Sequence, residues 1–207
     1  MNTDKKISRR EALKRMGFAV MSSAIASSGL LSLASCETKR SKRIIFYFTG
    51  TGNSLYIARQ LAGENAELLS IPQMVKRGKY EFEADEIGIV YPIYGHMPPY
   101  MVRQFIQKAK LKAEYKFAVL TYGARKCDAV EIWDRISRKA DNAFDYINTI
   151  IMGDNWRPNF DMNEQRKIDK HIPENLQKIT ADINSRQHWH EPVTEEERQQ
   201  HQGFMQR

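Results

Sequence analysis

The segment 44–63, IIFYFTGTGNSLYIARQLAG, constrains the fold more than any other part of the chain. It begins with a continuous apolar run of strand length, which is typical of a strand buried on both faces of a sheet. A turn of glycines, hydroxyls and one amide follows, and a helical pattern of apolar residues begins directly after it. Gly63 is a suitable end for that helix. The segment therefore predicts a strand, a tight turn and a helix in immediate succession.

The following part of the chain repeats this alternation. We expect further strands at 67–71, 86–91, 116–121 and 146–152, and helices at 98–110, 127–140 and 163–184. Pro173 lies within the last helix, which it would kink or split. Alternating strands and helices are typical of a parallel sheet that is covered on both faces. We therefore predict an α/β fold with a doubly wound, five-stranded parallel sheet.

The net charge of +7 comes entirely from the N-terminal region. Residues 1–43 carry ten Lys and Arg against three Asp and Glu, whereas residues 44–207 carry 22 residues of each sign. A folded part without net charge has no general attraction for polyanions. We therefore expect no nucleic-acid partner.

The chain has only two cysteines, Cys36 and Cys127. Two cysteines exclude a disulfide framework and any four-cysteine zinc or iron–sulfur site within this sequence. After the N-terminal region, no stretch has the roughly 18 uninterrupted apolar residues of a membrane span.

Residues 1–35 have the features of a secretory signal in the usual order. A charged segment with Arg9 and Arg10 precedes a weakly apolar stretch, rich in Ala and Ser, over 18–35. The paired arginines resemble a twin-arginine motif, and the Leu-Ala-Ser-Cys sequence ending at Cys36 resembles a lipobox. We expect export across the cytoplasmic membrane, lipidation of Cys36, and a basic tether over 36–43 that holds the protein in the periplasm or cell envelope. The alternative is a disordered basic tail with a chance apolar run.

The glycine turn after the first strand has the form of a phosphate site, because a helix N-terminus attracts anions and glycines let the backbone come close to them. It is neither a nucleotide P-loop, which needs a Lys, nor a dinucleotide fingerprint, which needs a third glycine where Leu55 stands. Neutral donors remain, from Thr49, Thr51, Asn53 and Ser54. They suit the terminal phosphate of a bound cofactor that is not transferred. A purely structural glycine turn is the alternative.

The sequence FTGTGNS over 48–54 resembles the FMN phosphate loop of flavodoxins. It is most similar to the flavodoxin half of proteins that fuse a flavodoxin domain to a bacterial-type ferredoxin. The resemblance covers about residues 43–184 and includes VYPIYGHMPPYMVRQFI at 90–106, VLTYGA at 119–124 and MGDNW at 152–156. It implies a flavodoxin-like sheet with strand order 2-1-3-4-5, helices on both faces and bound FMN over a domain at 44–184.

The resemblance also implies which residues bind the flavin. Tyr94 would lie near the isoalloxazine and Gly95 would face its N5 atom, whereas Tyr122 and Gly123 would contact the other edge of the ring. Trp156 is a further candidate. The implied FMN-binding residues are Thr49, Gly50, Thr51, Gly52, Asn53, Ser54, Pro92, Tyr94, Gly95, Tyr122 and Gly123. No catalytic side chain is assigned, since the chemistry would take place on the flavin.

We therefore expect a membrane-tethered FMN protein that acts in electron transfer or as an oxidoreductase. The cysteines of a ferredoxin half are not in this sequence, and the domain is neutral where typical flavodoxins are acidic. The redox partner stays open between a protein, a quinone and NAD(P)H. The alternatives are an NAD(P)H-dependent FMN reductase of quinones or small molecules, and a non-enzymatic flavodoxin-like binding lipoprotein.

Two further features each allow two interpretations. Cys127 follows the third flavin loop and is either an inert thiol at a helix start or a thiol near the flavin. His188, His190 and Glu191 could chelate a metal, but we expect a solvated, polar and loose tail over 185–207 and no metal site.

Overall fold

The computed structural model of the protein describes residues 43–63, 66–154 and 160–206. The signal, Cys36, nearly all of the tether and Trp156 lie outside the described residues, so the expectations for them stay predictions. Within these ranges, no helix has the length and apolar character that a membrane crossing would require.

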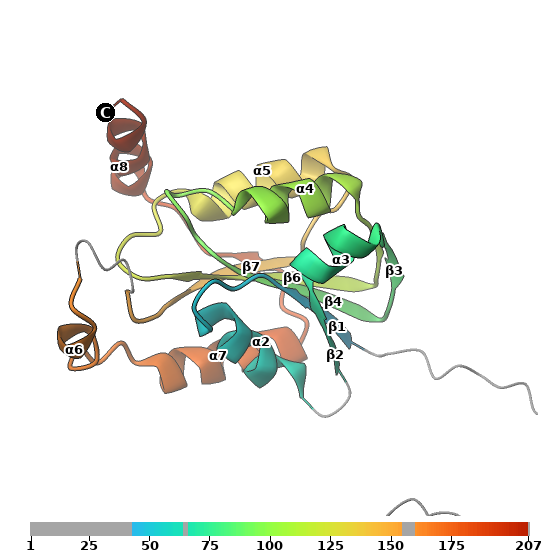
Figure 1. The fold of residues 1–207 in the computed structure, drawn as a ribbon, viewed down its shortest axis with the longest axis horizontal. Coiled ribbons are helices and arrows are strands. Elements are labelled where there is room, and N and C mark those ends of the chain that lie inside the picture. Colours follow the sequence, from blue (N-terminus) through green and yellow to red (C-terminus); the bar gives the residue numbers. More distant parts are fainter. Residues whose placement is uncertain (1–42, 64–65, 155–159, 207) are drawn as a thin grey trace, which may run out of the picture. The chain divides into compact units, whose positions relative to one another are not determined.

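The described residues form a six-stranded sheet with the order β2-β1-β4-β6-β7-β8, and every neighbouring pair is parallel (Figure 1). Its first five strands reproduce the expected 2-1-3-4-5 order of a flavodoxin-like doubly wound sheet, which confirms the predicted fold class. The strands are β1 (Arg43–Tyr47), β2 (Ala66–Ser70), β4 (Glu86–Pro92), β6 (Tyr115–Tyr122), β7 (Tyr146–Ile151) and β8 (Trp189–His190).

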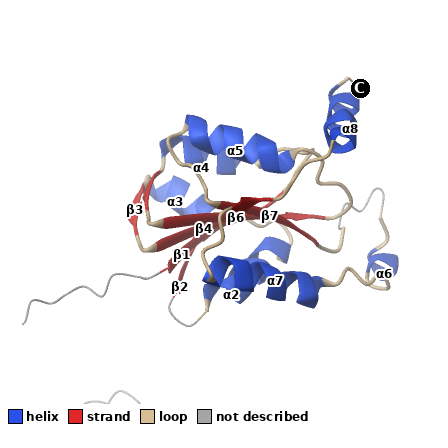
Figure 2. Cartoon of the chain, turned by 180° about the vertical axis from the view of Figure 1, so that it is seen from behind, coloured by secondary structure: helices blue, strands red, loops and turns tan. Residues whose placement is uncertain are grey.

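Helices cover both faces of the sheet (Figures 1 and 2). On one face lie α2 (Asn53–Ala62) and α7 (Ile172–Asn184), and on the other lie α3 (Ile71–Arg77), α4 (Tyr100–Lys108) and α5 (Ala129–Lys139). Successive residues of β1 alternate between the two cores: Phe46 packs with the cluster under α3, α4 and α5, and Ile45 with the cluster under α2 and α7. A strand buried on both faces therefore reads as a continuous apolar run, as the sequence predicted.

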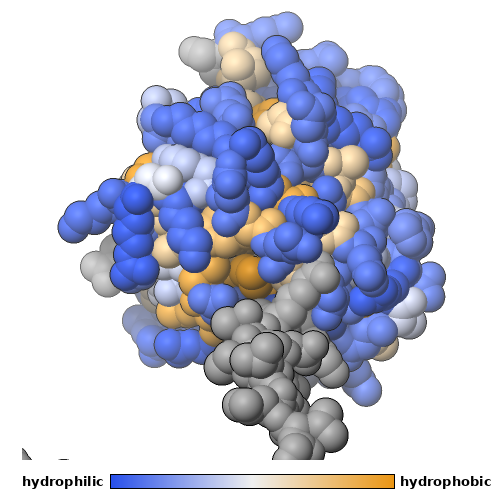
Figure 3. Space-filling model, turned by 90° about the vertical axis from the view of Figure 1, so that its right-hand side faces the viewer, coloured by the Kyte–Doolittle hydropathy of each residue, from blue (hydrophilic) through white to orange (hydrophobic). Residues whose placement is uncertain are grey.

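A small parallel sheet of β3 (Glu81–Glu83) and β5 (Lys110–Lys112), together with α3, was not predicted. Strands of three residues are too short to show the alternation of apolar and polar residues from which a strand is predicted. The strand β2 ends at Ser70, one residue before the predicted end, and Pro72 stands in the first turn of α3, where its missing N–H costs nothing. Cross-strand ion pairs such as Lys110–Glu81, at 2.7 Å, lie on this sheet and are well exposed. Figure 3 views this side of the protein and shows mostly hydrophilic residues with hydrophobic ones visible between them.

The predicted helix over 163–184 is two helices, α6 (Met162–Gln165) and α7, separated by residues 166–171. Pro173 stands in the first turn of α7, where proline is favoured, rather than inside a continuous helix. Ile168 lies in the break and is 52% exposed, so it is not part of the buried face of either helix.

The expectation of a loose tail over 185–207 is also wrong. Trp189 and His190 form β8, whose pairing with β7 extends the expected sheet by a sixth strand. Residues Glu195–Met205 form α8, which begins with a capping box between Thr194 and Glu197. The box satisfies N–H groups at the helix start, which is why so polar a segment forms a helix here.

Candidate functional site

The carboxyl ends of β1, β4 and β6 bring the three loops singled out in the sequence to one edge of the sheet. The chain leaves β1 toward β2 on one side, whereas β4 continues toward β6 on the other, so the strand order reverses between β1 and β4. Backbone bonds join the loop starts: Phe48 N donates to Val90 O at 3.0 Å, and Ile93 N to Thr121 O at 2.8 Å. Ligands of open α/β sheets bind at such a reversal.

A hydrogen bond to the side chain of Thr49, at the start of the turn, closes the glycine turn between β1 and α2. The N–H of Gly52 donates to Thr49 Oγ1 at 2.9 Å. Gly52 is the N-cap of α2, with φ of 103°, a conformation that residues with a side chain rarely adopt. Because this N-cap has no side chain, it supplies no side-chain oxygen to the N–H groups of the first helical turn. Gly50 and Thr51 are exposed, so the turn is open to solvent.

Asn53 and Ser54 anchor the turn rather than presenting their side chains on its surface. Ser54 is 1% exposed, and its hydroxyl lies 2.8 Å from Thr121 Oγ1 on β6. The side-chain amide of Asn53 donates to Gly153 O, after β7, at 3.1 Å. These bonds fix the turn against two neighbouring strands. Any contact that either residue makes with a ligand at the turn surface would therefore come mainly from its backbone N–H.

The second loop is a tight turn that starts two residues after Pro92, the last residue of β4. Tyr94 and Met97 exchange two backbone hydrogen bonds of 3.0 Å each, and the two residues between them, Gly95 and His96, have φ of 54° and 65°. Two-residue turns between antiparallel pairs favour positive φ at both central positions. Glycine suits the first position because it has no Cβ.

Tyr94 connects this second loop to the glycine turn. A Cβ placed on Gly50 would lie 2.6 Å from the Tyr94 hydroxyl, so Gly50 makes room for that side chain. The ring of Phe48 meets the ring of Tyr94 edge-on, with centroids 6.4 Å apart. Tyr94 is nevertheless 51% exposed. The structure thus places the half-exposed ring of Tyr94 beside the glycine turn.

The third loop begins at Tyr122 and Gly123, at the end of β6. A Cβ on Gly123 would lie 2.5 Å from the Asp154 carboxylate, so this position also requires glycine for a close approach. Lys170 Nζ donates to Gly123 O at 3.1 Å. Burial, and then the charge of Glu191, raise the pKa of Tyr122, so its hydroxyl is protonated at neutral pH. Tyr122 and Gly123 thus lie at the same edge as the glycine turn.

Sequence reasoning missed that the C-terminal helix also reaches this edge. Phe204 of α8 lies within 3.7 Å of where a Cβ on Gly95 would stand. His96 lies between Phe204 and Cys127, with its Nε2 atom 3.9 Å from the Cys127 sulfur. Burial raises the pKa of the Cys127 thiol, which favours the inert interpretation of this cysteine. The T-x-x-E pattern at 194–197 was the sequence signal that could have revealed α8.

Two of the candidate metal ligands, His190 and Glu191, have structural roles. His190 Nε2 lies 2.9 Å from Phe144 O. Glu191 accepts hydrogen bonds from the Thr149 N–H and hydroxyl and forms an ion pair with Lys126. Across the part of the chain that the structure describes, no group of three or more His, Cys, Asp or Glu side chains is placed to hold a metal.

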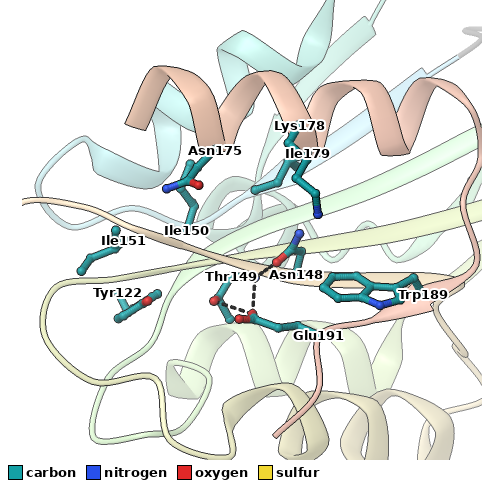
Figure 4. A pocket seen from close by; sticks show the side chains of 10 residues that line it. All are labelled: Tyr122, Asn148, Thr149, Ile150, Ile151, Asn175, Lys178, Ile179, Trp189 and Glu191. Carbon is teal, nitrogen blue, oxygen red and sulfur yellow. Dashed lines mark hydrogen bonds between the residues drawn. The ribbon is translucent and has the colours of Figure 1, made fainter. Parts of the chain in front are cut away.

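A separate pocket of about 250 Å³ lies between α7, β7 and β8 (Figure 4). Its charged side chains already have partners: Lys178 lies over the Trp189 ring at 5.4 Å, and Glu191 is held by Thr149. Of the residues predicted to bind the flavin, Tyr122 alone lines it, so it is not the predicted site. The lining residues are Tyr122, Asn148, Thr149, Ile150, Ile151, Asn175, Lys178, Ile179, Trp189 and Glu191.

Among the comparisons with known proteins, only those with solved structures find a similarity. No protein-family model matches the chain, and no curated protein matches it in sequence. Among solved structures, the solution structure of two-electron-reduced flavodoxin from Megasphaera elsdenii is 17% identical, with a TM-score of 0.43. That match covers 55% of this chain and 88% of the flavodoxin.

Two further solved structures are similar at the same level. A flavoprotein in complex with FMN from Lactobacillus acidophilus is 12% identical, with a TM-score of 0.40, over 53% of this chain and 93% of that one. The rubredoxin oxygen:oxidoreductase of Desulfovibrio gigas is 14% identical, with a TM-score of 0.42, over 67% of this chain and 36% of that one. At these identities and TM-scores, the likenesses assign neither a ligand nor an activity to the chain.

Proposed function

We propose that the chain binds FMN at the carboxyl edge of its sheet and acts as an electron-transfer or oxidoreductase flavoprotein. One observation carries this proposal: the glycine turn before α2, the Tyr94 turn and the Tyr122 loop meet where the strand order reverses. The first offers neutral donors for a phosphate, and the other two carry aromatic rings for a flat ligand.

The residues present fit FMN better than a nucleotide. Thr49, Thr51 and the backbone N–H groups of Gly50, Asn53 and Ser54 would hold the phosphate, in a turn that the bond from Gly52 N to Thr49 Oγ1 keeps closed. The turn itself contains no cation, so it suits a phosphate that is bound and not transferred. Bound FMN would supply the redox chemistry, and the protein would position its ring and limit its contact with water.

The half-exposed ring of Tyr94 and the partly buried ring of Tyr122 would hold the isoalloxazine. Gly95, which has no side chain of its own and a φ of 54°, would give it access to a backbone carbonyl of the turn. Burial raises the pKa of the Tyr94 hydroxyl, so it remains neutral and can donate a hydrogen bond at physiological pH.

Titration of the purified protein with FMN and with riboflavin tests this proposal. We expect FMN to bind at least about 100-fold more tightly than riboflavin, because several hydrogen bonds to a charged group, each worth roughly 1.5–3 kcal/mol, are lost without the phosphate. Flavin fluorescence during titration measures both affinities. Equal affinities would remove the glycine turn from the site, and no binding of either flavin would contradict the proposed function.

We further propose that the protein is exported in its folded, FMN-loaded state and held at a membrane by a lipid on Cys36. Support comes from the sequence features of residues 1–36. A noncovalent cofactor acquired in the cytoplasm crosses the membrane only inside a folded carrier, which gives the twin-arginine route a physical reason.

Changing Arg9 and Arg10 together to lysine is expected to leave uncleaved precursor in the cytoplasm, whereas Lys39→Arg with Lys42→Arg should be exported normally. Cell fractionation and the mass of the mature protein measure the outcome. Changing Cys36 to serine should abolish the lipid but not the cofactor. Normal export of the doubly substituted Arg9 and Arg10 protein would show that another route is used.

A further inference from the structure

The C-terminal helix α8 is held on the protein almost entirely by polar contacts. None of its residues is buried. Its capping box stabilises it as a helix, and it follows β8 through the short connection 191–194. Figures 1 and 2 both show α8 beside α5, at the edge of the sheet that carries the candidate site. A helix docked without buried apolar surface is held far more weakly than the core helices.

Three polar contacts connect α8 to the start of α5 and the loop before it; we call them the latch. Arg198 donates two hydrogen bonds to the Glu131 carboxylate, at 2.7 and 3.0 Å. His201 Nδ1 lies 2.6 Å from Asp128 Oδ1. Lys126 Nζ lies 3.4 Å from Glu197 Oε1, and this lysine also pairs with Glu191.

The far end of α8 reaches the Gly95 turn. The Phe204 ring meets the His96 ring at 90°, with centroids 4.8 Å apart, and His96 also contacts His201 at 5.3 Å. Phe204 keeps 51% of its surface exposed and Met205 keeps 70%, while Tyr94 on the same turn is 51% exposed. The exposed Phe204 side chain of α8 therefore lies beside the turn that would hold the flavin ring.

We propose that α8 is a movable outer wall of the ligand site, with Phe204 closing against the Gly95 turn and the latch holding the helix in place. The inference rests on the proposed function and adds to it an element that covers the bound flavin. The Arg198–Glu131 pair keeps 38% and 44% of its side chains exposed and contributes little by itself, whereas the other two latch pairs keep only 14–20%. Because no residue of α8 is buried, opening the helix exposes little apolar surface and costs less than unfolding a core helix. Opening would admit the flavin or its redox partner, and closing would shield the ring from water.

Cys127 provides a direct measure of this opening. Its side chain is buried, and its sulfur lies 3.9 Å from Gln200 Oε1 on α8 and 3.9 Å from His96 Nε2. In a full-length Cys36→Ser protein, Cys127 is the sole thiol. Its alkylation by iodoacetamide should then require α8 to move away, so the alkylation rate reports the open fraction.

The first arm breaks and restores the latch. In Arg198→Glu, the new carboxylate faces the carboxylate of Glu131 and repels it. We expect alkylation of Cys127 to become about five- to tenfold faster. Adding Glu131→Arg reverses the pair and should return the rate to within about twofold of the unaltered latch. Arg138→Glu is the matched control, because Arg138 pairs with Asp134 on the same helix, α5, at 2.8 Å and touches no α8 residue in the structure. An unchanged rate in Arg198→Glu would overturn the proposal.

The second arm measures FMN dissociation in the same proteins and in Phe204→Ala. We expect dissociation to be about fivefold faster in Arg198→Glu and Phe204→Ala, and to be restored in the charge-reversed pair. If alkylation responds to the latch while FMN dissociation does not, α8 moves but is not a wall of this site, and the inference falls while the proposed function stands. If no variant binds FMN, the proposed function falls and the inference falls with it.

Discussion

Replacing Gly52 with valine is expected to weaken FMN binding by at least about 100-fold, equivalent to roughly 2.7 kcal/mol. Gly52 has φ of 103° at the N-cap of α2. A β-branched residue in such a conformation costs about 1–3 kcal/mol, and the chain can relieve this strain only by moving the turn. Moving the turn displaces the N–H groups that would hold the phosphate. Titration with FMN, followed by fluorescence, measures the loss.

The matched control is Gly78→Val. Gly78 also has positive φ, 65°, but it ends α3 at the opposite end of the sheet. We expect a similar loss of unfolding free energy in urea for both variants and normal FMN binding for Gly78→Val alone. Riboflavin, which lacks the phosphate, should bind Gly52→Val and the unaltered protein with similar weak affinity. Unchanged FMN affinity in Gly52→Val would show that the phosphate lies elsewhere.

Replacing Gly88 with alanine is expected to destabilise the protein by about 3 kcal/mol, near the upper end for overpacking a core. Gly88 is in the middle of β4, and the ring of Phe117 on β6 occupies the space where its Cβ would stand. Phe117 is fully buried, so the ring has no free space to move into. The added methyl group must push apart two central strands of the sheet. Urea unfolding followed by circular dichroism measures the change.

A second substitution identifies the cause. In the Gly88→Ala background, Phe117→Leu removes the ring that overlaps the new methyl group, and part of the lost stability should return. In the unaltered protein, the same Phe117→Leu change should destabilise, since it leaves a cavity. The two substitutions are thus expected to be strongly non-additive. Additive effects would show that the cost of Gly88→Ala lies in the backbone and not in the contact with Phe117.

The predicted elements that the structure confirms are those with a strong local pattern. The apolar run of β1, the glycine turn and α2 are contiguous, and each is specified by its own residues. Parallel strands joined by helices follow right-handed crossovers, so few strand orders remain once the alternation is recognised. The reversal between β1 and β4, and with it the position of the candidate site, follows from that order.

Elements without a local pattern could not be predicted in this way. The strand β8 has two residues, and β3 and β5 have three each. Such strands exist because an adjacent strand offers hydrogen bonds, as Ile147 O does to the N–H of Glu191. The helix α8 is polar from Glu195 to Gln202 and owes its position to charged partners on a different part of the chain, among them Glu131.

Residues that are close together in the chain suffice to predict the α/β class, the glycine turn and the three loops of the candidate site. The packing of the folded chain sets which side chains of those loops face outward. Ser54 is turned inward by Thr121, which is 67 residues away, and Gly50 leaves room for Tyr94. It also decided that Phe204 lies beside Gly95. Contacts between distant residues depend on the packing of the whole chain, and no local pattern encodes them.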